Sequence, residues 1–168
     1  MRLFAAVPIE IEDKMKIKRF ADSVAESGVT GNYIDPVNYH VTLAYIGETD
    51  MPEIAFRTVS TFDFFKFTST IDLFCNFDRT LWVGPEEHGL LYRLVRLTAN
   101  KMCCAGFEIE NRPIVPHITI CKNAELPKRY REPFLLPFKL MVSKVSIMNS
   151  IDTGSGVKYE ELFSIDLK

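Results

Sequence analysis

The stretch Tyr39-His40-Val41-Thr42-Leu43 has a close counterpart later in the chain, Pro116-His117-Ile118-Thr119-Ile120. Both follow the pattern His, apolar, Thr, apolar, and this alternation predicts β-strands. Residues i and i+2 of a strand point to the same face, so each motif places an imidazole beside a hydroxyl. The intervening apolar residues point to the other face, where a core would lie. We therefore expect two strands whose histidines and threonines face one cleft.

Each motif lies in a half of the chain that also has a long amphipathic segment. Periodic apolar residues predict helices over residues 9–27 and 86–104, with a shorter helix over 52–60. The repetition indicates two similar halves of one α+β unit and not a solenoid, which needs several repeats. Pro113 and Pro116 bracket an extended segment before the second motif, and residues 32–38 are expected to form a loop. Strands are predicted over residues 2–7, 39–46, 62–74, 80–83, 117–121, 138–149 and 159–167.

Composition narrows the class of protein. The 168 residues are 47% hydrophobic and 25% charged, which is typical of a soluble globular domain. Twenty basic against twenty-two acidic residues argue against a strongly cationic duplex binder, whose affinity comes from neutralising phosphates. The longest apolar stretches fall far short of the roughly 20 residues of a membrane-spanning helix, and no signal peptide is evident. The four cysteines lack CxxC spacing, so we expect a cytoplasmic protein with reduced thiols.

Two imidazoles and two hydroxyls in one cleft suit the hydrolysis of a phosphodiester by in-line displacement. That reaction needs a base to activate water and an acid to protonate the leaving oxygen, on opposite sides of phosphorus. Histidine can fill either role near neutral pH, and a threonine hydroxyl can donate a hydrogen bond to a non-bridging oxygen. We expect His40 and His117 to be catalytic and Thr42 and Thr119 to bind the phosphate, with no metal or cofactor.

The motifs and their neighbours resemble the two-histidine (2H) phosphoesterase superfamily. The closer resemblance is to the LigT-like RNA 2′,3′-cyclic phosphodiesterases, historically called 2′–5′ RNA ligases. The matching segments span nearly the whole chain in the family's order: an opening strand at residues 2–8, the first motif at 38–47, a central strand at 81–84, the second motif at 115–122 and a closing hairpin at 145–159.

This resemblance implies a bilobal α+β fold in which antiparallel sheets line a central cleft and helices cover the outer faces. Residues 1–168 would form a single domain with two pseudo-symmetric lobes. The implied reaction is hydrolysis of RNA or nucleotide 2′,3′-cyclic phosphates to 2′-phosphates, with His40 as the acid to the 3′ oxygen and His117 as the base on water. The residues alone do not fix these two roles. The implied substrates are RNA 3′ ends or nucleotides that bear the cyclic phosphate. No membrane or protein partner is evident, and we expect a monomer.

Two positions depart from the family pattern. Ala44 stands where the family often has arginine, and Lys122 stands where arginine is common. Lys122 is assigned to phosphate binding, although its odd offset from His117 would turn it to the opposite face unless the strand ends or bulges. Two alternatives remain open. The same residues would act on 2′,5′-linked or other cyclic nucleotide diesters, and Ala44 keeps open a nucleotide- or RNA-binding module with little turnover.

Other candidates are weaker. His88 is expected at the surface, and a zinc site of His40, His88 and His117 lacks a carboxylate at ligand spacing. Arg79 and the basic run over residues 128–131 could contact RNA, but a solvated charged surface is favoured for both. The glycines at 154 and 156 indicate a hairpin turn and not a phosphate loop.

Overall fold

A computed structural model describes residues 1–110 and 114–168. Within these residues the chain forms three α-helices and a 3₁₀ turn: α1 (Ile11–Glu26), α2 (Pro52–Ser60), α3 (Leu90–Cys104) and η1 (Pro36–Asn38). The strands are β1 (Arg2–Pro8), β2 (Thr30–Tyr33), β3 (His40–Glu48), β4 (Phe67–Ile71), β5 (Leu73–Phe77), β6 (Thr80–Gly84), β7 (Ile118–Glu125), β8 (Phe138–Val142), β9 (Lys144–Asp152) and β10 (Val157–Asp166). Pro113, expected to begin an extended segment, lies outside the described residues.

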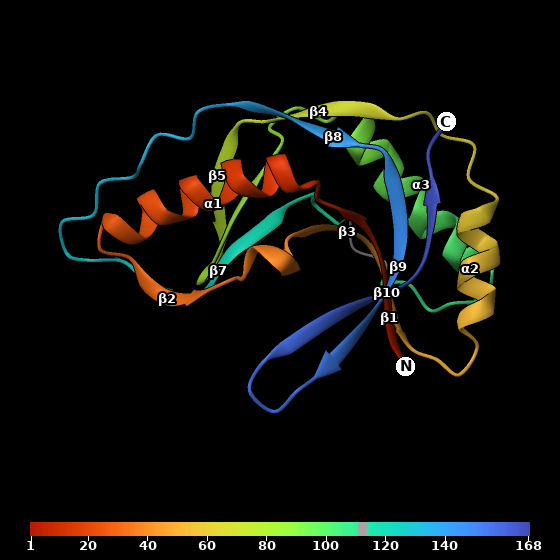
Figure 1. Cartoon of the computed structure of the whole chain (residues 1–168). Helices are drawn as coiled ribbons and strands as arrows, with labels where there is room; N and C mark the ends of the chain where they lie inside the picture. The colour runs from red at the N-terminus through yellow and green to blue at the C-terminus, as the bar shows by residue number, and fades with distance from the viewer. Residues whose placement is uncertain (111–113) are drawn as a thin grey trace.

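The strands form two four-stranded antiparallel sheets and a two-stranded ribbon. The first sheet has the order β10-β9-β1-β3, the second has the order β2-β7-β6-β5, and β4 pairs with β8. The two motif strands, β3 and β7, contact each other although they belong to different sheets. Figure 1 shows β3 and β7 between the helix α1 and the helices α2 and α3. The predicted fold class, α+β with antiparallel sheets, is confirmed.

The long helices connect the two sheets. Helix α1 follows β1 of the first sheet but packs against β7 of the second. Helix α3 follows β6 of the second sheet but packs against β3 of the first. Each helix buries an apolar stripe, with Ile17 and Val24 on α1 and Leu91 and Leu94 on α3, which is the periodicity that predicts these helices. The backs of the two motif strands are therefore held by helices from opposite halves of the chain.

One contiguous hydrophobic cluster runs through both sheets. It includes Val41 and Leu43 on β3, Ile118 and Ile120 on β7, and Leu94 on α3, all almost fully buried. Complete burial of a side chain of this kind contributes roughly 1.5–3 kcal/mol. The apolar residues that flank the motif threonines thus fix both strands to the core and leave their other faces free for chemistry.

Three predicted elements are wrong. The segment over 62–74 is not one strand, because the chain leaves β4 at Asp72 and joins the second sheet as β5. The segment over 138–149 is likewise divided at Ser143 into β8 and β9, which have different partners. The expected loop over 32–38 contains the end of β2, an exposed edge strand that pairs with β7.

Among residues 1–110 and 114–168, no helix combines the length and apolar character that crossing a bilayer requires.

Candidate active site

A cavity lies at His117 of the second motif and extends to strand β3. A hollow of about 370 Å³ is lined by Tyr45, which lies on β3, and by Val115 and His117, which lead into β7. Phe77 at the end of β5 completes this side of the wall. Of the four predicted site residues, His117 lines this cavity, and the first-motif strand contributes Tyr45. His40, Thr42 and Thr119 are not among its lining residues, so a cleft shared by both motifs stays a prediction.

The two histidines are oriented in the same way. His40 Nδ1 lies 2.8 Å from the carbonyl oxygen of Asn38, and His117 Nδ1 lies 2.6 Å from that of Val115. Because a carbonyl only accepts, each Nδ1 carries the proton and donates it to the backbone two residues earlier. The neutral rings therefore each keep an unprotonated Nε2. This is the tautomer that a general base at Nε2 requires.

The two motif threonines differ in their hydrogen bonding. Thr42 Oγ1 lies 3.1 Å from His40 Nε2, so in the neutral state of the ring the hydroxyl donates to this nitrogen. Thr42 is also buried. Thr119 is partly exposed, and its hydroxyl has no hydrogen-bond partner among the described residues. The Thr119 hydroxyl is thus available to an incoming oxygen, whereas Thr42 also supports the His40 ring.

A β-bulge follows each motif at the same place. On β3, Leu43 is an extra residue between the pairs Ala5–Ala44 and Ala6–Thr42. On β7, Ile120 is the extra residue between the pairs Leu81–Cys121 and Trp82–Thr119. An extra residue shifts the alternation of the strand by one. The fifth residue after each histidine consequently returns to the motif face.

Those fifth residues are Tyr45 and Lys122, and both are exposed. Tyr45 lines the cavity beside His117. The positive charge of Lys122 lowers the pKa of His40, an effect that requires the two groups to lie close enough to interact. The assignment of Lys122 to phosphate binding requires the strand to end or bulge before this residue, and the bulge at Ile120 meets that condition. Sequence reasoning missed Tyr45, because nothing in the pattern of residues marks the bulge.

Aromatic rings surround each histidine. The ring of His40 lies 5.1 Å from that of Phe4 and 4.9 Å from that of Tyr159, between centroids. The ring of His117 lies 5.0 Å from that of Phe77 and 5.7 Å from that of Trp82. These contacts restrict the orientation of both imidazoles and contribute to their burial.

Burial lowers the pKa of both histidines below the ordinary value. The backbone hydrogen bonds to Asn38 and Val115 oppose this effect, while the positive charges of His117 and Lys122 lower the pKa of His40 further. Desolvation disfavours the charged imidazole, and a nearby positive charge acts in the same direction. Both shifts favour the neutral imidazole in the free protein.

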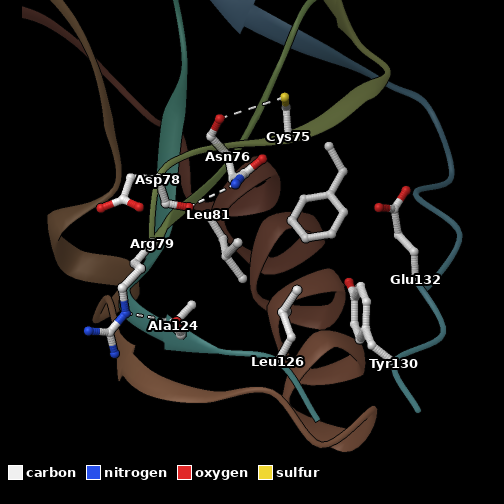
Figure 2. A pocket seen from close by; sticks show the side chains of 10 residues that line it. Cys75, Asn76, Asp78, Arg79, Leu81, Ala124, Leu126, Tyr130 and Glu132 are labelled. Carbon is white, nitrogen blue, oxygen red and sulfur yellow. Dashed lines mark hydrogen bonds between the residues drawn. The ribbon is translucent and has the colours of Figure 1, made fainter. Parts of the chain in front are cut away.

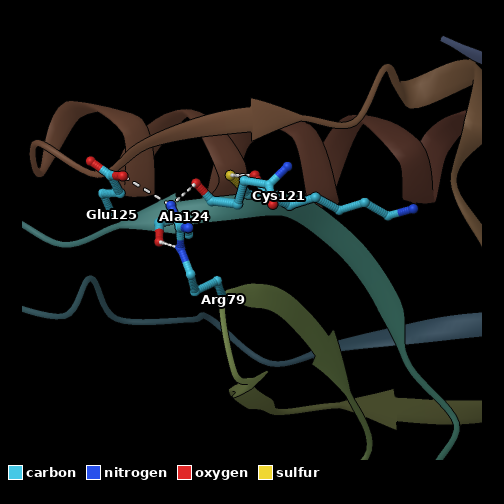
Figure 3. Close-up of polar contacts among 6 residues, drawn as sticks. Arg79, Cys121, Ala124 and Glu125 are labelled. Atoms are coloured by element: carbon cyan, nitrogen blue, oxygen red, sulfur yellow. Dashed lines mark hydrogen bonds and ion pairs between the residues drawn. The ribbon is translucent and has the colours of Figure 1, made fainter.

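Arg79 has a structural role. Its guanidinium donates to the carbonyl oxygens of Ala124 and Asn123, at 3.2 and 3.3 Å, and pairs with Glu125 at 2.9 Å. Figure 3 shows these contacts, which tie the β5–β6 turn to the end of β7. Arg79 also lines a separate cavity of about 360 Å³ with Leu126, Tyr130 and other residues, which is drawn in Figure 2. The sequence favours a solvated charged surface for Arg79, whereas the structure uses its donors in hydrogen bonds and an ion pair with the end of β7.

The three histidines do not form a metal centre. His88 is exposed, precedes α3 and stacks on Tyr92 at 4.0 Å between ring centroids. Helix α3 begins at Leu90, later than predicted. Among the described residues, no group of three His, Cys, Asp or Glu side chains is placed to hold a metal ion.

Comparison with known proteins gives the same assignment as the motifs. No model of a protein family matches the chain. The chain is 27% identical to an RNA 2′,3′-cyclic phosphodiesterase of Thermotoga maritima, over 97% of this chain and 94% of that protein. It is 29% identical to one of Archaeoglobus fulgidus, over 96% and 98%. The chain is a relative of the RNA 2′,3′-cyclic phosphodiesterases. The resemblance carried by the two motifs is thereby confirmed, and these relatives bear the name of an enzyme, as the motifs predict.

Solved structures of LigT share the whole architecture. E. coli LigT in its apo form superposes with a TM-score of 0.82 at 22% identity, covering 99% of this chain and 96% of LigT. LigT in complex with 3′-AMP gives a TM-score of 0.78 at 23% identity, over 99% and 97%. At this identity the likeness establishes that the chain has the LigT fold.

Proposed function

We propose that this protein is a metal-independent phosphodiesterase that opens 2′,3′-cyclic phosphates on RNA 3′ ends or nucleotides and leaves a 2′-phosphate. The observation that carries the proposal is the matched geometry of the two motifs. Each has an imidazole with Nδ1–H fixed to the backbone, a threonine two residues on, and a bulge directly after it. The names of the curated relatives support the same substrate class.

In the proposed reaction, His117 Nε2 accepts a proton from water as the water oxygen attacks phosphorus. The bond between phosphorus and O3′ breaks, and protonated His40 gives its Nε2 proton to O3′. The products are a 2′-phosphomonoester and a free 3′-hydroxyl, so one water is consumed and the protons balance. Both histidines return to their starting states by exchange with solvent. Proton transfer by a positioned histidine contributes about 10²–10⁴ in rate.

The negative charge of the bound substrate would raise the pKa of His40, so that this residue can act as the acid. Burial and the nearby positive charges keep His40 neutral in the free protein, whereas an acid must be protonated. A bound phosphodiester is anionic, and a negative charge within a few ångströms favours the charged imidazole. Lys122 would balance part of the phosphate charge, while the Thr42 and Thr119 hydroxyls would donate to the non-bridging oxygens.

A substrate panel tests the reaction. Purified protein is incubated in EDTA with 2′,3′-cyclic AMP, 3′,5′-cyclic AMP and a 2′,5′-linked dinucleotide, and ³¹P NMR identifies the product phosphate. We expect turnover of the 2′,3′-cyclic compound to 2′-AMP without a metal. Preference for the 2′,5′-linked compound would replace this substrate assignment, and a 3′-AMP product would reverse the roles of the histidines. Binding of 2′-AMP without any hydrolysis would favour a binding module.

We also propose that the protein works as a cytoplasmic monomer. Cys75, Cys103 and Cys104 are exposed free thiols, which persist in a reducing compartment. Both motifs belong to one chain, and their strands β3 and β7 contact each other, so the proposed chemistry needs no second copy. Light scattering coupled to gel filtration should give the mass of a single chain.

A further inference from the structure

A second groove lies next to the active-site cavity. It has a volume of about 590 Å³ and follows the exposed side of α3 from His88 to Cys103. Its opposite wall includes Ile109, Glu110 and Ile114, and these three residues also line the cavity at His117. The two hollows therefore share a wall, and the groove continues from the active site along the helix.

The floor of this groove carries two arginines that have no role in the fold. Arg93 and Arg96 are exposed, and neither guanidinium has a hydrogen bond or ion pair among the described residues. Residues three apart on a helix are surface neighbours, with about 5–6 Å between Cβ atoms. Two adjacent guanidinium groups can bind one phosphate, or successive phosphates of a strand, through charge-assisted hydrogen bonds.

The groove also offers aromatic surface. His88 and Tyr92 stack on each other at the N-terminal end of α3, and both line the groove. Exposed aromatic rings beside cations are the usual combination for single-stranded nucleic acid, because bases stack on the rings while the cations follow the backbone. The acidic side chain of Glu110 lies in the wall and would repel a phosphate. The attraction for phosphate therefore comes from the arginines on α3.

We propose that this groove, which we call the α3 groove, binds the single-stranded RNA that lies 5′ of the terminal cyclic phosphate. Arg93 and Arg96 would contact backbone phosphates, and the His88–Tyr92 pair would stack on a base. This inference rests on the proposed function for the identity of the 3′ end. It adds that the preferred substrate is an oligonucleotide and not a mononucleotide.

The test compares an RNA with a nucleotide in a binding assay that needs no turnover. The probe is a 5′-fluorescein hexaribonucleotide that ends in a 2′-phosphate, and fluorescence anisotropy gives its affinity across a range of salt concentrations. The double variant Arg93→Ala/Arg96→Ala should bind this RNA about tenfold more weakly. Its salt dependence should fall by about 1.4 in slope, since each phosphate contact on a single strand contributes about 0.7. The affinity for 2′-AMP and the hydrolysis of 2′,3′-cyclic AMP should stay at the wild-type level.

The matched control removes two charges from the other basic surface, in the double variant Lys128→Ala/Arg129→Ala. Both residues are exposed in the loop after β7, and the control should bind the RNA as wild type does. A loss confined to the control would place the RNA on that loop and overturn the inference. Equal RNA affinity of the Arg93→Ala/Arg96→Ala variant and the wild type would also overturn it. Failure of the proposed function is distinguishable, because the wild type would then not hydrolyse 2′,3′-cyclic AMP whatever it binds.

Discussion

Lys122 and Tyr45 occupy the same place relative to their motifs, and the difference between them makes the two histidines unequal. Each residue lies five positions after its histidine and returns to the motif face because of the bulge between them. One is a cation that affects His40 and the other is a phenol beside His117. In the proposed reaction the cation would give the phosphate a counter-charge, and the ring would give a nucleoside an apolar surface.

Replacement of Lys122 by Met should raise the pKa of His40 toward its ordinary value. The side chain keeps its length and loses its positive charge, which at present lowers that pKa. The limb of the kcat/KM profile that depends on protonation of His40 should move to higher pH, and kcat/KM at pH 7 should fall about tenfold through the lost phosphate contact. NMR titration of the His40 ring protons measures the shift directly. Lys128→Met, on an exposed loop, serves as the control, and an unchanged His40 titration in Lys122→Met would remove Lys122 from the site.

At the scale of elements, the spacing of apolar residues correctly predicted the helices and strands that bury an apolar face. Helices α1 and α2 and strand β3 lie close to the expected ranges, because their apolar residues repeat at the period of the element that buries them. Strand β2 was missed because it is an exposed edge strand held by backbone hydrogen bonds to β7. The boundary at Asp72 was missed because residues on both sides of it favour strands, and only their partners differ.

The candidate site likewise has a part that the sequence predicts and a part that depends on strand pairing. The alternation of the first motif predicted that His40 and Thr42 share a face, and their 3.1 Å hydrogen bond agrees with this. Thr42 is buried and His117 directly precedes β7, and the catalytic assignment of the four residues stays a prediction. The face of Lys122 depended on a bulge at Ile120, which is a property of the pairing between β6 and β7. A bulge between two apolar residues leaves no mark in the sequence, so the role of Tyr45 could not be predicted either.

Replacement of Gly84 by Ala tests how the second motif is positioned. A Cβ at this position would lie 2.7 Å from the carbonyl oxygen of Pro116 and 3.1 Å from Cζ3 of Trp82. The backbone directly before His117 would have to move, at a cost of about 1–3 kcal/mol in the free energy of unfolding. We expect kcat to fall at least about tenfold, since small displacements of catalytic groups are costly.

Gly156→Ala is the matched control, because a Cβ there meets no atom within 4 Å. Urea denaturation should place this control within about 0.5 kcal/mol of wild type. Wild-type stability and activity in Gly84→Ala would show that the contact between β6 and Pro116 does not position His117.

At the scale of the whole molecule, the exchange of helices joins the two sheets. Helix α1 covers β7 and α3 covers β3, and a single hydrophobic cluster includes residues of both sheets. Neither sheet keeps its cover if the other half of the chain unfolds. The cleft between the motif strands is therefore set by the same packing that stabilises the fold.

We predict that the two sheets unfold together. Trp82, the single tryptophan, reports on the second sheet by fluorescence, and far-UV circular dichroism reports on the whole chain. Their urea transitions should coincide, as a two-state transition requires. Leu94→Ala, a fully buried position on α3, should lower the stability by about 2–5 kcal/mol and shift both transitions equally. Separate midpoints would contradict a single cooperative unit.

The central claim is that His40 and His117 act together on one phosphorus atom without a metal. The most direct measurement is kcat/KM for hydrolysis of 2′,3′-cyclic AMP in EDTA by wild type, His40→Ala, His117→Ala and the double variant, with His88→Ala as a folded control. Each single change should cost about 10²–10⁴, the double variant should lose little more because the pair works as a unit, and His88→Ala should match wild type. Near-wild-type rates in a folded His40→Ala or His117→Ala variant, or loss of wild-type activity in EDTA, would contradict the claim.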